Sequence, residues 1–244
     1  EMLRSLVGSE MCIRDRDEVT HDGACFHVFA GKEQLTARTV VAATGTWSAP
    51  FIPYYPGTFD GRQWHSAFYP GPADFAGSTV AVVGAANSGA QIAADLLLSG
   101  VETTWYTRSS PRWMPDDVDG RVLFQRNRAR LNAMLRGEPD PGADTNLGDI
   151  VMVPPVLRAR DSGLLQATPM FSSLDEVNTD HLIWCTGFRP ALQPIRGLLD
   201  GTSPTVDGLF LVGYGTWTGP GSATITGVSP FAKQTAHDVA NICD

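Results

Sequence analysis

The sequence lacks an excess of basic residues and lacks the long apolar run that a membrane helix needs. Its 26 acidic residues outnumber its 18 basic residues, giving a net charge of −8. A nucleic-acid-binding protein needs a basic face to neutralise phosphates, so this balance argues against that class. The uncharged stretch Gly77–Ala94 is interrupted by Gly, Asn, Ser and Gln, and we therefore expect no transmembrane helix and no membrane partner.

Cysteine is also scarce. Cys12, Cys25, Cys185 and Cys243 show neither the spacing of a metal site nor short-range pairing, and no CxxC motif occurs. We expect no bound metal. With no secretory leader in the sequence, the cysteine pattern predicts a reducing, cytoplasmic location.

Hydrophobic residues make up 43% of the chain and charged residues 18%, as in a globular protein with a core. The sequence begins with Glu1 rather than Met, which suggests a fragment of a longer reading frame. Residues 1–16 (EMLRSLVGSEMCIRDR) have no helical or strand period. We expect this segment to be foreign to the native fold, with a frayed native terminus as the alternative.

The middle of the chain predicts a βαβ unit. STVAVVGA is a run of β-branched and small residues typical of a buried parallel strand, NSGAQIAADLLLSG has the pattern of a helix, and VETTWYTR forms the next strand. Short strands are expected over 17–50, a Pro-rich ordered linker over 51–76, and a helix around Arg121–Leu135. Further strands are expected in IVMVPPV, DHLIWCTGF and GLFLVGYG, and a helix within Thr224–Ile242.

A glycine motif lies at the strand–helix junction of that unit. Gly84 and Gly89 occupy the first and third positions of GxGxxG, and Ala86 stands where the middle glycine is usual. Gly84 permits a tight turn and Gly89 a close helix–strand approach, while the helix start at Asn87 and Ser88 offers N–H groups to a pyrophosphate. The methyl group of Ala86 predicts a slightly more distant cofactor. The alternative is plain α/β packing.

The second strand ends at Arg108, where a dinucleotide fold carries its ribose-binding residue. An arginine there suits the 2′-phosphate of NADP, and Ser109, Ser110 and Arg112 would add donors. A solvated surface arginine is the alternative.

Three further motifs surround the βαβ unit. Residues 59–69 fit F-x-G-x-x-x-H-x-x-x-Y, in which His65 either organises the linker or acts in acid–base chemistry. VVAATG (Val40–Gly45) and LIWCTGF (Leu182–Phe188) end two strands with small residues, as expected where backbone lies against a cofactor. The last predicted strand leads into Gly213 and Tyr214.

On these motifs the chain resembles class B flavin-containing monooxygenases, and more narrowly the flavoprotein monooxygenases of bacterial arsenic-resistance operons. The narrower resemblance rests on ATGTWSAP, HSAFY, VVGAANSGAQI, MPDDVDGRVLFQR, GDIVMVPPV, IWCTGFRPAL and LVGYGTWTG, and extends over nearly all of residues 17–244. It implies an α/β flavoprotein of two dinucleotide-binding (Rossmann-like) domains. An NADPH-binding domain (77–179) would be inserted, after the linker 51–76, into a partial FAD-binding domain (17–50 and 180–244).

The resemblance also implies two sets of cofactor-binding residues. The NADPH set is Gly84, Ala86, Asn87, Ser88, Gly89, Arg108, Ser109, Thr186 and Gly187, and the FAD set is Ala43, Thr44, Gly45, Gly213 and Tyr214. Tyr214 replaces the aspartate of many relatives, which puts a ribityl-binding carboxylate in doubt. No side-chain nucleophile is expected, because the cofactors carry the chemistry.

The implied activity is an NADPH-dependent monooxygenation. NADPH would reduce FAD, oxygen would add at flavin C4a, and the resulting hydroperoxide would oxygenate a small soft nucleophile such as a trivalent arsenical. The GxGxxG that should hold the FAD pyrophosphate is absent from the sequence, so we expect an N-terminally truncated, inactive fragment. The alternatives are a disulfide-type flavin reductase, which would need a CxxC, and a non-catalytic nucleotide-binding redox module.

Overall fold

The computed structural model describes residues 16–118, 120–139, 141, 149–225 and 227–243. The described residues divide into two compact units. Unit 1 takes those within Glu1–Ala49, Arg130–Glu138 and Pro190–Asp244, and unit 2 takes those within Pro50–Ala129 and Pro139–Arg189. The segment 1–16, expected to be foreign, lies outside the described residues except for Arg16, which begins the first strand.

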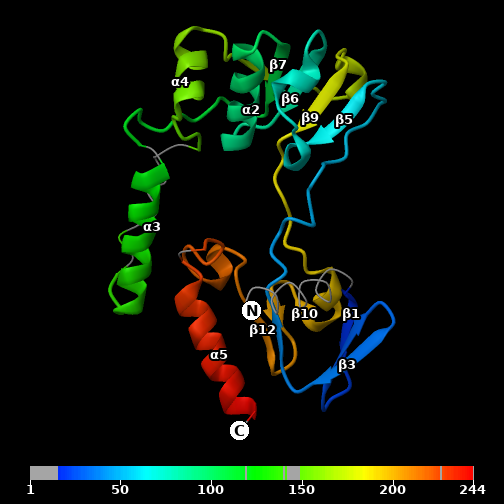
Figure 1. The fold of residues 1–244 in the computed structure, drawn as a ribbon, viewed down its shortest axis with the longest axis vertical. Helices are drawn as coiled ribbons and strands as arrows, with labels where there is room; N and C mark the ends of the chain where they lie inside the picture. Colours follow the sequence, from blue (N-terminus) through cyan, green and yellow to red (C-terminus); the bar gives the residue numbers. More distant parts are fainter. Residues whose placement is uncertain (1–15, 119, 140, 142–148, 226, 244) are drawn as a thin grey trace. The chain divides into compact units, whose positions relative to one another are not determined.

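Unit 2 is built on a five-stranded parallel sheet with the order β5-β9-β6-β7-β8 (Figure 1). Its central strand is buried because every residue from Val80 to Val83 is apolar. The strands are β5 (Arg62–His65), β6 (Thr79–Val83), β7 (Glu102–Thr107), β8 (Ala167–Pro169) and β9 (His181–Trp184).

The predicted βαβ unit is present. Helix α2 (Asn87–Leu98) connects β6 to β7 and buries Ile92 and Leu96 in the core of unit 2. It ends before Gly100, whose φ of 78° lies in the left-handed region that favours glycine. Helix α4 (Pro154–Asp161) packs against α2, and the division between the units falls within α3 (Gly120–Leu135).

Unit 1 contains an antiparallel sheet of three strands, β1 (Arg16–His21), β2 (Phe26–Ala30) and β3 (Glu33–Ala37). A parallel pair joins β4 (Val40–Ala42) to β12 (Leu209–Leu211), and a small antiparallel pair joins β10 (Leu199–Asp200) to β11 (Ser203–Pro204). Helix α5 (Ser229–Cys243) ends the described chain. Both units also contain short 3-10 helices. In unit 2 these are η1 (Ser66–Phe68), η2 (Pro72–Phe75) and η3 (Leu174–Glu176), and in unit 1 they are η4 (Gln193–Leu198) and η5 (Thr216–Thr218).

The α/β fold class with a parallel sheet is confirmed, but one local prediction is wrong. IVMVPPV was expected to be a strand, yet Ile150 forms only an isolated bridge with Trp113 and α4 begins at Pro154. Two prolines at the helix start explain the difference, since the first turn needs no N–H donors. The linker 51–76 was expected to be ordered, and the structure places β5 within it, paired with β9.

The expected domain boundaries also differ from those of the compact units. The boundaries at 76/77 and 179/180 fall inside unit 2, because β9 lies between β5 and β6 in its sheet. The linker and β9 therefore belong with the βαβ unit.

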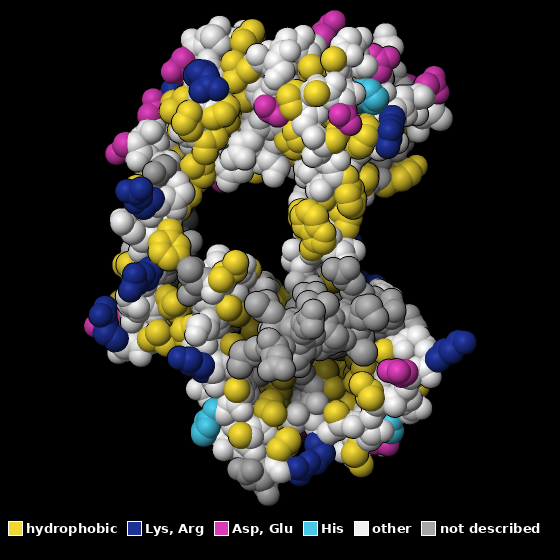
Figure 2. All heavy atoms as spheres, viewed as in Figure 1, with side chains coloured by type: hydrophobic (Ala, Val, Ile, Leu, Met, Phe, Trp, Pro, Cys, Tyr) yellow, Lys and Arg dark blue, Asp and Glu magenta, His cyan; other side chains and the backbone are white. Residues whose placement is uncertain are grey.

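On the face drawn in Figure 2, side chains of both charges are interspersed with hydrophobic ones. Among the described helices, none is both long and apolar enough to span a membrane.

Asp180 joins the starts of β9 and β6, and its replacement tests the sheet. Its Oδ2 accepts hydrogen bonds from the Thr79 backbone N–H at 2.8 Å and hydroxyl at 2.9 Å. These bonds, the backbone one first, lower the pKa of Asp180. Since the folded-state pKa lies below the unfolded one, the ionised carboxylate stabilises the fold above the unfolded pKa, and this stabilisation is lost as the pH falls through the folded-state pKa.

We therefore expect Asp180→Asn to lower the urea midpoint at neutral pH. The difference from the unmutated chain should narrow as the pH falls below the unfolded-state pKa and through the lowered folded-state pKa of Asp180. Asp60→Asn makes the same charge change at an exposed position of unit 2 and serves as the control. A difference that stays constant with pH would rule out this role for the carboxylate.

Candidate functional site

The turn after β6 requires glycine at position 84. Gly84 has a φ of 141°, and a Cβ atom there would lie 2.4 Å from the Cys185 carbonyl oxygen. Two hydrogen bonds fix the residue: its N–H donates to the Tyr106 carbonyl at 3.0 Å, and its carbonyl accepts from Trp105 Nε1 at 2.7 Å. The backbone at Gly84 is therefore held close to both neighbouring strands.

Helix α2 approaches this turn just as closely. A Cβ atom on Gly89 would lie 2.0 Å from the Gly84 carbonyl oxygen, so only glycine fits at that position of the helix. The helix starts at Asn87 after Ala86, and no side chain caps it. Its first backbone N–H groups and the positive end of its dipole are suited to an anionic ligand.

The side chains at the helix start differ in their contacts. Asn87 Oδ1 accepts the Val151 N–H at 2.8 Å, which fastens the segment before α4 to the turn. Ser88 and Ala86 are exposed. Ala86 has an extended backbone (φ −110°, ψ −170°) that any residue adopts, so its methyl group strains nothing in the protein.

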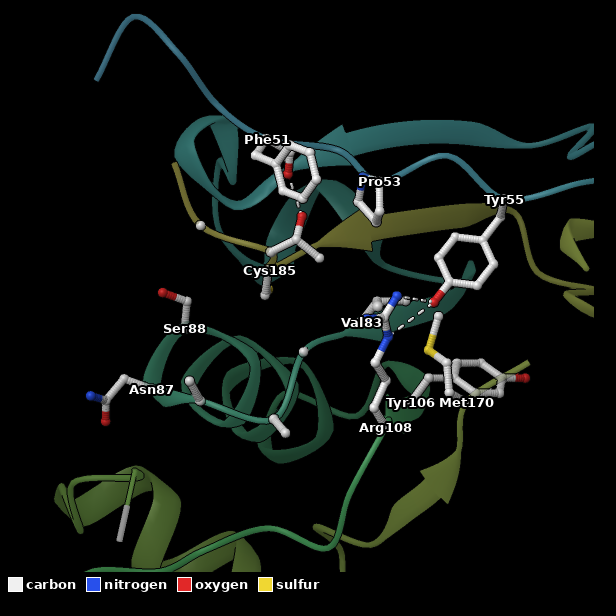
Figure 3. A pocket seen from close by; sticks show the side chains of 15 residues that line it. Phe51, Pro53, Tyr55, Val83, Asn87, Ser88, Tyr106, Arg108, Met170 and Cys185 are labelled. Carbon is white, nitrogen blue, oxygen red and sulfur yellow. Dashed lines mark hydrogen bonds between the residues drawn. The ribbon is translucent and has the colours of Figure 1, made fainter. Parts of the chain in front are cut away.

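A pocket of about 520 Å³ lies where β6, β7 and β9 end (Figure 3). In open parallel sheets, ligands bind at the carboxyl ends of the strands, and this pocket lies at that edge of the sheet. In Figure 3 the α2 start with Asn87 and Ser88 lies on one side, and Tyr55 with Arg108 lies on the other. The lining residues are Phe51, Pro53, Tyr55, Val83, Gly84, Ala85, Ala86, Asn87, Ser88, Tyr106, Arg108, Met170, Cys185, Thr186 and Gly187.

Most of the residues expected to bind NADPH line this pocket, but two do not. Gly89 is buried beneath the turn, and Ser109 is exposed outside the lining. Of the additional donors that were considered, Ser110 is also outside it, and Arg112 forms an ion pair with Asp149 at 3.6 Å. Phe51, Tyr55 and Met170 also line the pocket but were not predicted. In the sequence their only signals are an aromatic- and proline-rich linker, for Phe51 and Tyr55, and a strand too short to predict, for Met170.

Arg108 follows β7 and is exposed at the pocket. Its Nη2 and Nε donate to the Tyr55 hydroxyl at 2.9 Å and 3.3 Å. The guanidinium therefore has a fixed neighbour and retains other N–H groups for a ligand.

His65 is 3% exposed and both of its ring nitrogens meet backbone groups. Nδ1 accepts the Ala67 N–H at 3.1 Å, which leaves the proton on Nε2, and Nε2 donates to the Gly187 carbonyl at 2.8 Å. The same carbonyl accepts the Phe51 N–H at 2.9 Å. These contacts tie the linker to the segment after β9 and favour the organising interpretation of His65 over acid–base chemistry.

Thr186 and Cys185 complete this part of the wall. The Thr186 hydroxyl donates to the Phe51 carbonyl. Burial raises the pKa of the Cys185 thiol to about 12, so the thiol stays protonated at neutral pH. Among the described residues, no cluster of His, Cys, Asp and Glu is suited to a metal ion.

The residues expected to bind FAD lie in unit 1. The Tyr214 hydroxyl lies 3.1 Å from the Thr44 nitrogen and 2.7 Å from its Oγ1, which in turn donates to the Ala191 carbonyl at 2.6 Å. Gly45 and Gly213 have φ values of 64° and 86°, and Ala43 directly follows β4. The structure thus brings the ends of β4 and β12 together. In the part of unit 1 that it describes, no β-strand leads through a short glycine turn directly into an α-helix, as β6 leads into α2 in unit 2.

Three comparisons place the chain among known proteins. The family described as pyridine nucleotide-disulphide oxidoreductase matches residues 17–208. A solved flavin-containing monooxygenase from Stenotrophomonas maltophilia is 40% identical, with a TM-score of 0.73 over 94% of this chain and 70% of that chain.

The chain is also similar to two curated oxidoreductases. An uncharacterised CzcO-like oxidoreductase of Geobacillus kaustophilus is 25% identical over 88% of this chain and 68% of its own length. A Baeyer-Villiger monooxygenase of Streptomyces coelicolor is 39% identical over 102 residues, which is 41% of this chain and 19% of that enzyme. The predicted two-domain flavoprotein fold is therefore confirmed.

Proposed function

Because the chain belongs to the pyridine nucleotide-disulphide oxidoreductases, and among them to the flavin-containing monooxygenases, we propose that it is part of an NADPH- and FAD-dependent monooxygenase. The pocket of unit 2 is then its NADPH site. One observation carries this proposal: a turn that only glycine fits, an uncapped helix start and an arginine all border one pocket.

The residues of the pocket suit NADPH. The N–H groups at the start of α2, at Asn87 and Ser88, would bind the pyrophosphate, and the glycine at 84 lets the backbone approach it. Arg108 would bind the 2′-phosphate, on the other side of the pocket in Figure 3. When bound, NADPH supplies reducing equivalents that FAD uses to activate oxygen.

The chain's own side chains then bind and orient rather than react. His65 and Thr186 hold the linker against the segment after β9, which forms one wall of the pocket. The protonated thiol of Cys185 contributes no thiolate. Together with the lack of a CxxC in the sequence, this disfavours the disulfide reductase alternative.

The fit to FAD is partial. Thr44, Gly45, Gly213 and Tyr214 would border the flavin. In the described part of unit 1, however, the glycines after β12 lead into the 3-10 helix η5, and no strand leads directly into an α-helix whose start could bind a pyrophosphate. We therefore assign no reaction step to FAD on this chain alone, and we expect the chain to retain FAD weakly. The substrate is proposed to be a small soft nucleophile. A trivalent arsenical is the first candidate, on sequence resemblance alone.

A titration of the purified chain with NADPH and NADH, followed by addition of FAD and measurement of flavin absorbance, tests the proposal. We expect NADPH to bind more tightly than NADH and FAD to wash off. A chain that unfolds cooperatively and yet binds neither dinucleotide would contradict the NADPH site. Tight retention of FAD would contradict the partial FAD site and favour a chain that is active by itself.

The non-catalytic alternative requires a different measurement. A longer chain carrying the complete FAD site should consume oxygen when NADPH is supplied, and faster with an arsenite or thioether substrate. Binding of both cofactors without oxygen consumption would favour a nucleotide-binding redox module.

A further inference from the structure

Tyr55 has its ring fixed by two aromatic neighbours in unit 2. The ring stacks on Trp184 at a centroid distance of 5.7 Å and an interplanar angle of 27°, and meets Phe171 edge-on at 5.1 Å. Trp184 is 1% exposed, and its Nε1 donates to Gln63 Oε1 at 2.8 Å. The tyrosine ring therefore rests on a buried, hydrogen-bonded platform.

The backbone beyond Tyr55 is fastened as well. The Pro56 carbonyl accepts the Leu174 N–H at 2.8 Å, and Asp175 Oδ1 accepts the Thr58 N–H at 2.9 Å and its hydroxyl at 3.0 Å. Between them, Gly57 has a φ of 89°, and a Cβ atom there would lie 2.3 Å from Ser173 Oγ. The linker holds Tyr55 in place from its backbone as well as from its ring.

The hydroxyl of this fixed ring meets the guanidinium of Arg108. It accepts from Nη2 at 2.9 Å and from Nε at 3.3 Å, as the dashed lines in Figure 3 show. An exposed arginine samples many rotamers, and ordering it on a ligand costs conformational entropy. Since the hydroxyl occupies the Nε side, the Nη1 side of the guanidinium stays available for a phosphate.

We propose that Tyr55 is a positioning residue that makes the pocket selective for a ribose bearing a 2′-phosphate. It does so by holding Arg108 in its binding orientation before the ligand arrives. The proposal rests on the proposed NADPH site and adds to it a residue of the linker that touches no phosphate itself. Its contribution is preorganisation, so it should be visible only with ligands that Arg108 binds.

The test is Tyr55→Phe, which removes the hydroxyl and keeps the ring on its platform. Dissociation constants for NADP⁺ and NAD⁺ are measured by calorimetry on the whole chain. We expect NADP⁺ to bind about five-fold more weakly, the effect of one hydrogen bond, and NAD⁺ to be unchanged. In the background of Arg108→Ala, Tyr55→Phe should cause no further loss. Tyr54→Phe, the same change at a side chain that is 91% exposed, is the matched control.

The other outcomes overturn the proposal. Equal weakening of NADP⁺ and NAD⁺ would make Tyr55 a structural residue, and tighter NADP⁺ binding would mean that its hydroxyl competes with the phosphate. A loss that persists beside Arg108→Ala would mean that it acts without the arginine. If the folded, unmutated chain binds neither dinucleotide, the NADPH site itself is wrong. If Tyr55→Phe leaves NADP⁺ binding unchanged, only the role of Tyr55 is refuted.

Discussion

Replacing Arg108 with alanine is expected to weaken NADPH binding roughly 10- to 150-fold, the effect of losing one charge-assisted phosphate contact of about 1.5–3 kcal/mol. NADH, which has no 2′-phosphate, should lose little. Arg108 is exposed, so the free protein should lose little stability, and the contact with the Tyr55 hydroxyl is the main one removed. Fluorescence titrations with both nucleotides at one ionic strength measure the two ratios.

The control must reproduce the change in charge, because the chain carries a net charge of −8 and every lost cation disfavours an anionic ligand. Arg62 begins β5, and since the sheet is parallel it lies at the edge opposite the pocket. Arg62→Ala should therefore change NADPH and NADH binding slightly and equally. If Arg108→Ala weakens both nucleotides to the same extent, Arg108 does not bind the 2′-phosphate.

How much of the site was predictable depended on whether its contacts are local in sequence. Gly84, Gly89 and the start of α2 belong to one short strand–turn–helix segment, so spacing alone predicted them. Arg108 followed from the length of that unit. These residues are close in the sequence, and their geometry is set by β6, α2 and β7 themselves.

The contribution of the linker could not be predicted, because it arises from contacts distant in the sequence. Tyr55 is placed at the pocket by its ring contacts with Trp184 and Phe171, and β5 pairs with β9, which brings residues 62–65 beside 181–184. For the same reason, the partners of His65 were not foreseen, and its role stayed open between two interpretations. For segment 150–156 the local sequence predicted the wrong element. Its valines favour a strand, whereas its two prolines begin a helix.

The second large effect concerns the close contact beneath the pocket. We expect Gly89→Ala to destabilise unit 2 by about 3 kcal/mol, the upper range of overpacking, and to abolish measurable NADPH binding. Helix propensity alone predicts the opposite sign, because alanine is favoured over glycine within a helix by about 1 kcal/mol. The outcome decides which effect is larger.

The cost of steric overlap should exceed the gain in helix propensity, because neither side of the contact can move freely. The added Cβ atom would lie 2.0 Å from the Gly84 carbonyl oxygen, which is held by Trp105 Nε1 at 2.7 Å. The Gly84 N–H is bound to the Tyr106 carbonyl at 3.0 Å, so relief requires moving α2 away from the sheet. The helix start and the turn together form one side of the pocket, and that movement would separate them.

Urea unfolding followed by tryptophan fluorescence measures this effect, since Trp105 and Trp184 are each 1% exposed in unit 2. Gly120→Ala is the matched control, because Gly120 lies at the exposed start of α3 with no atom within 4 Å of an added Cβ and no left-handed φ. That variant should be neutral or slightly more stable. If Gly89→Ala proves as stable as Gly120→Ala and still binds NADPH, then α2 does not approach the turn this closely, and the glycine at 89 is dispensable for the nucleotide site.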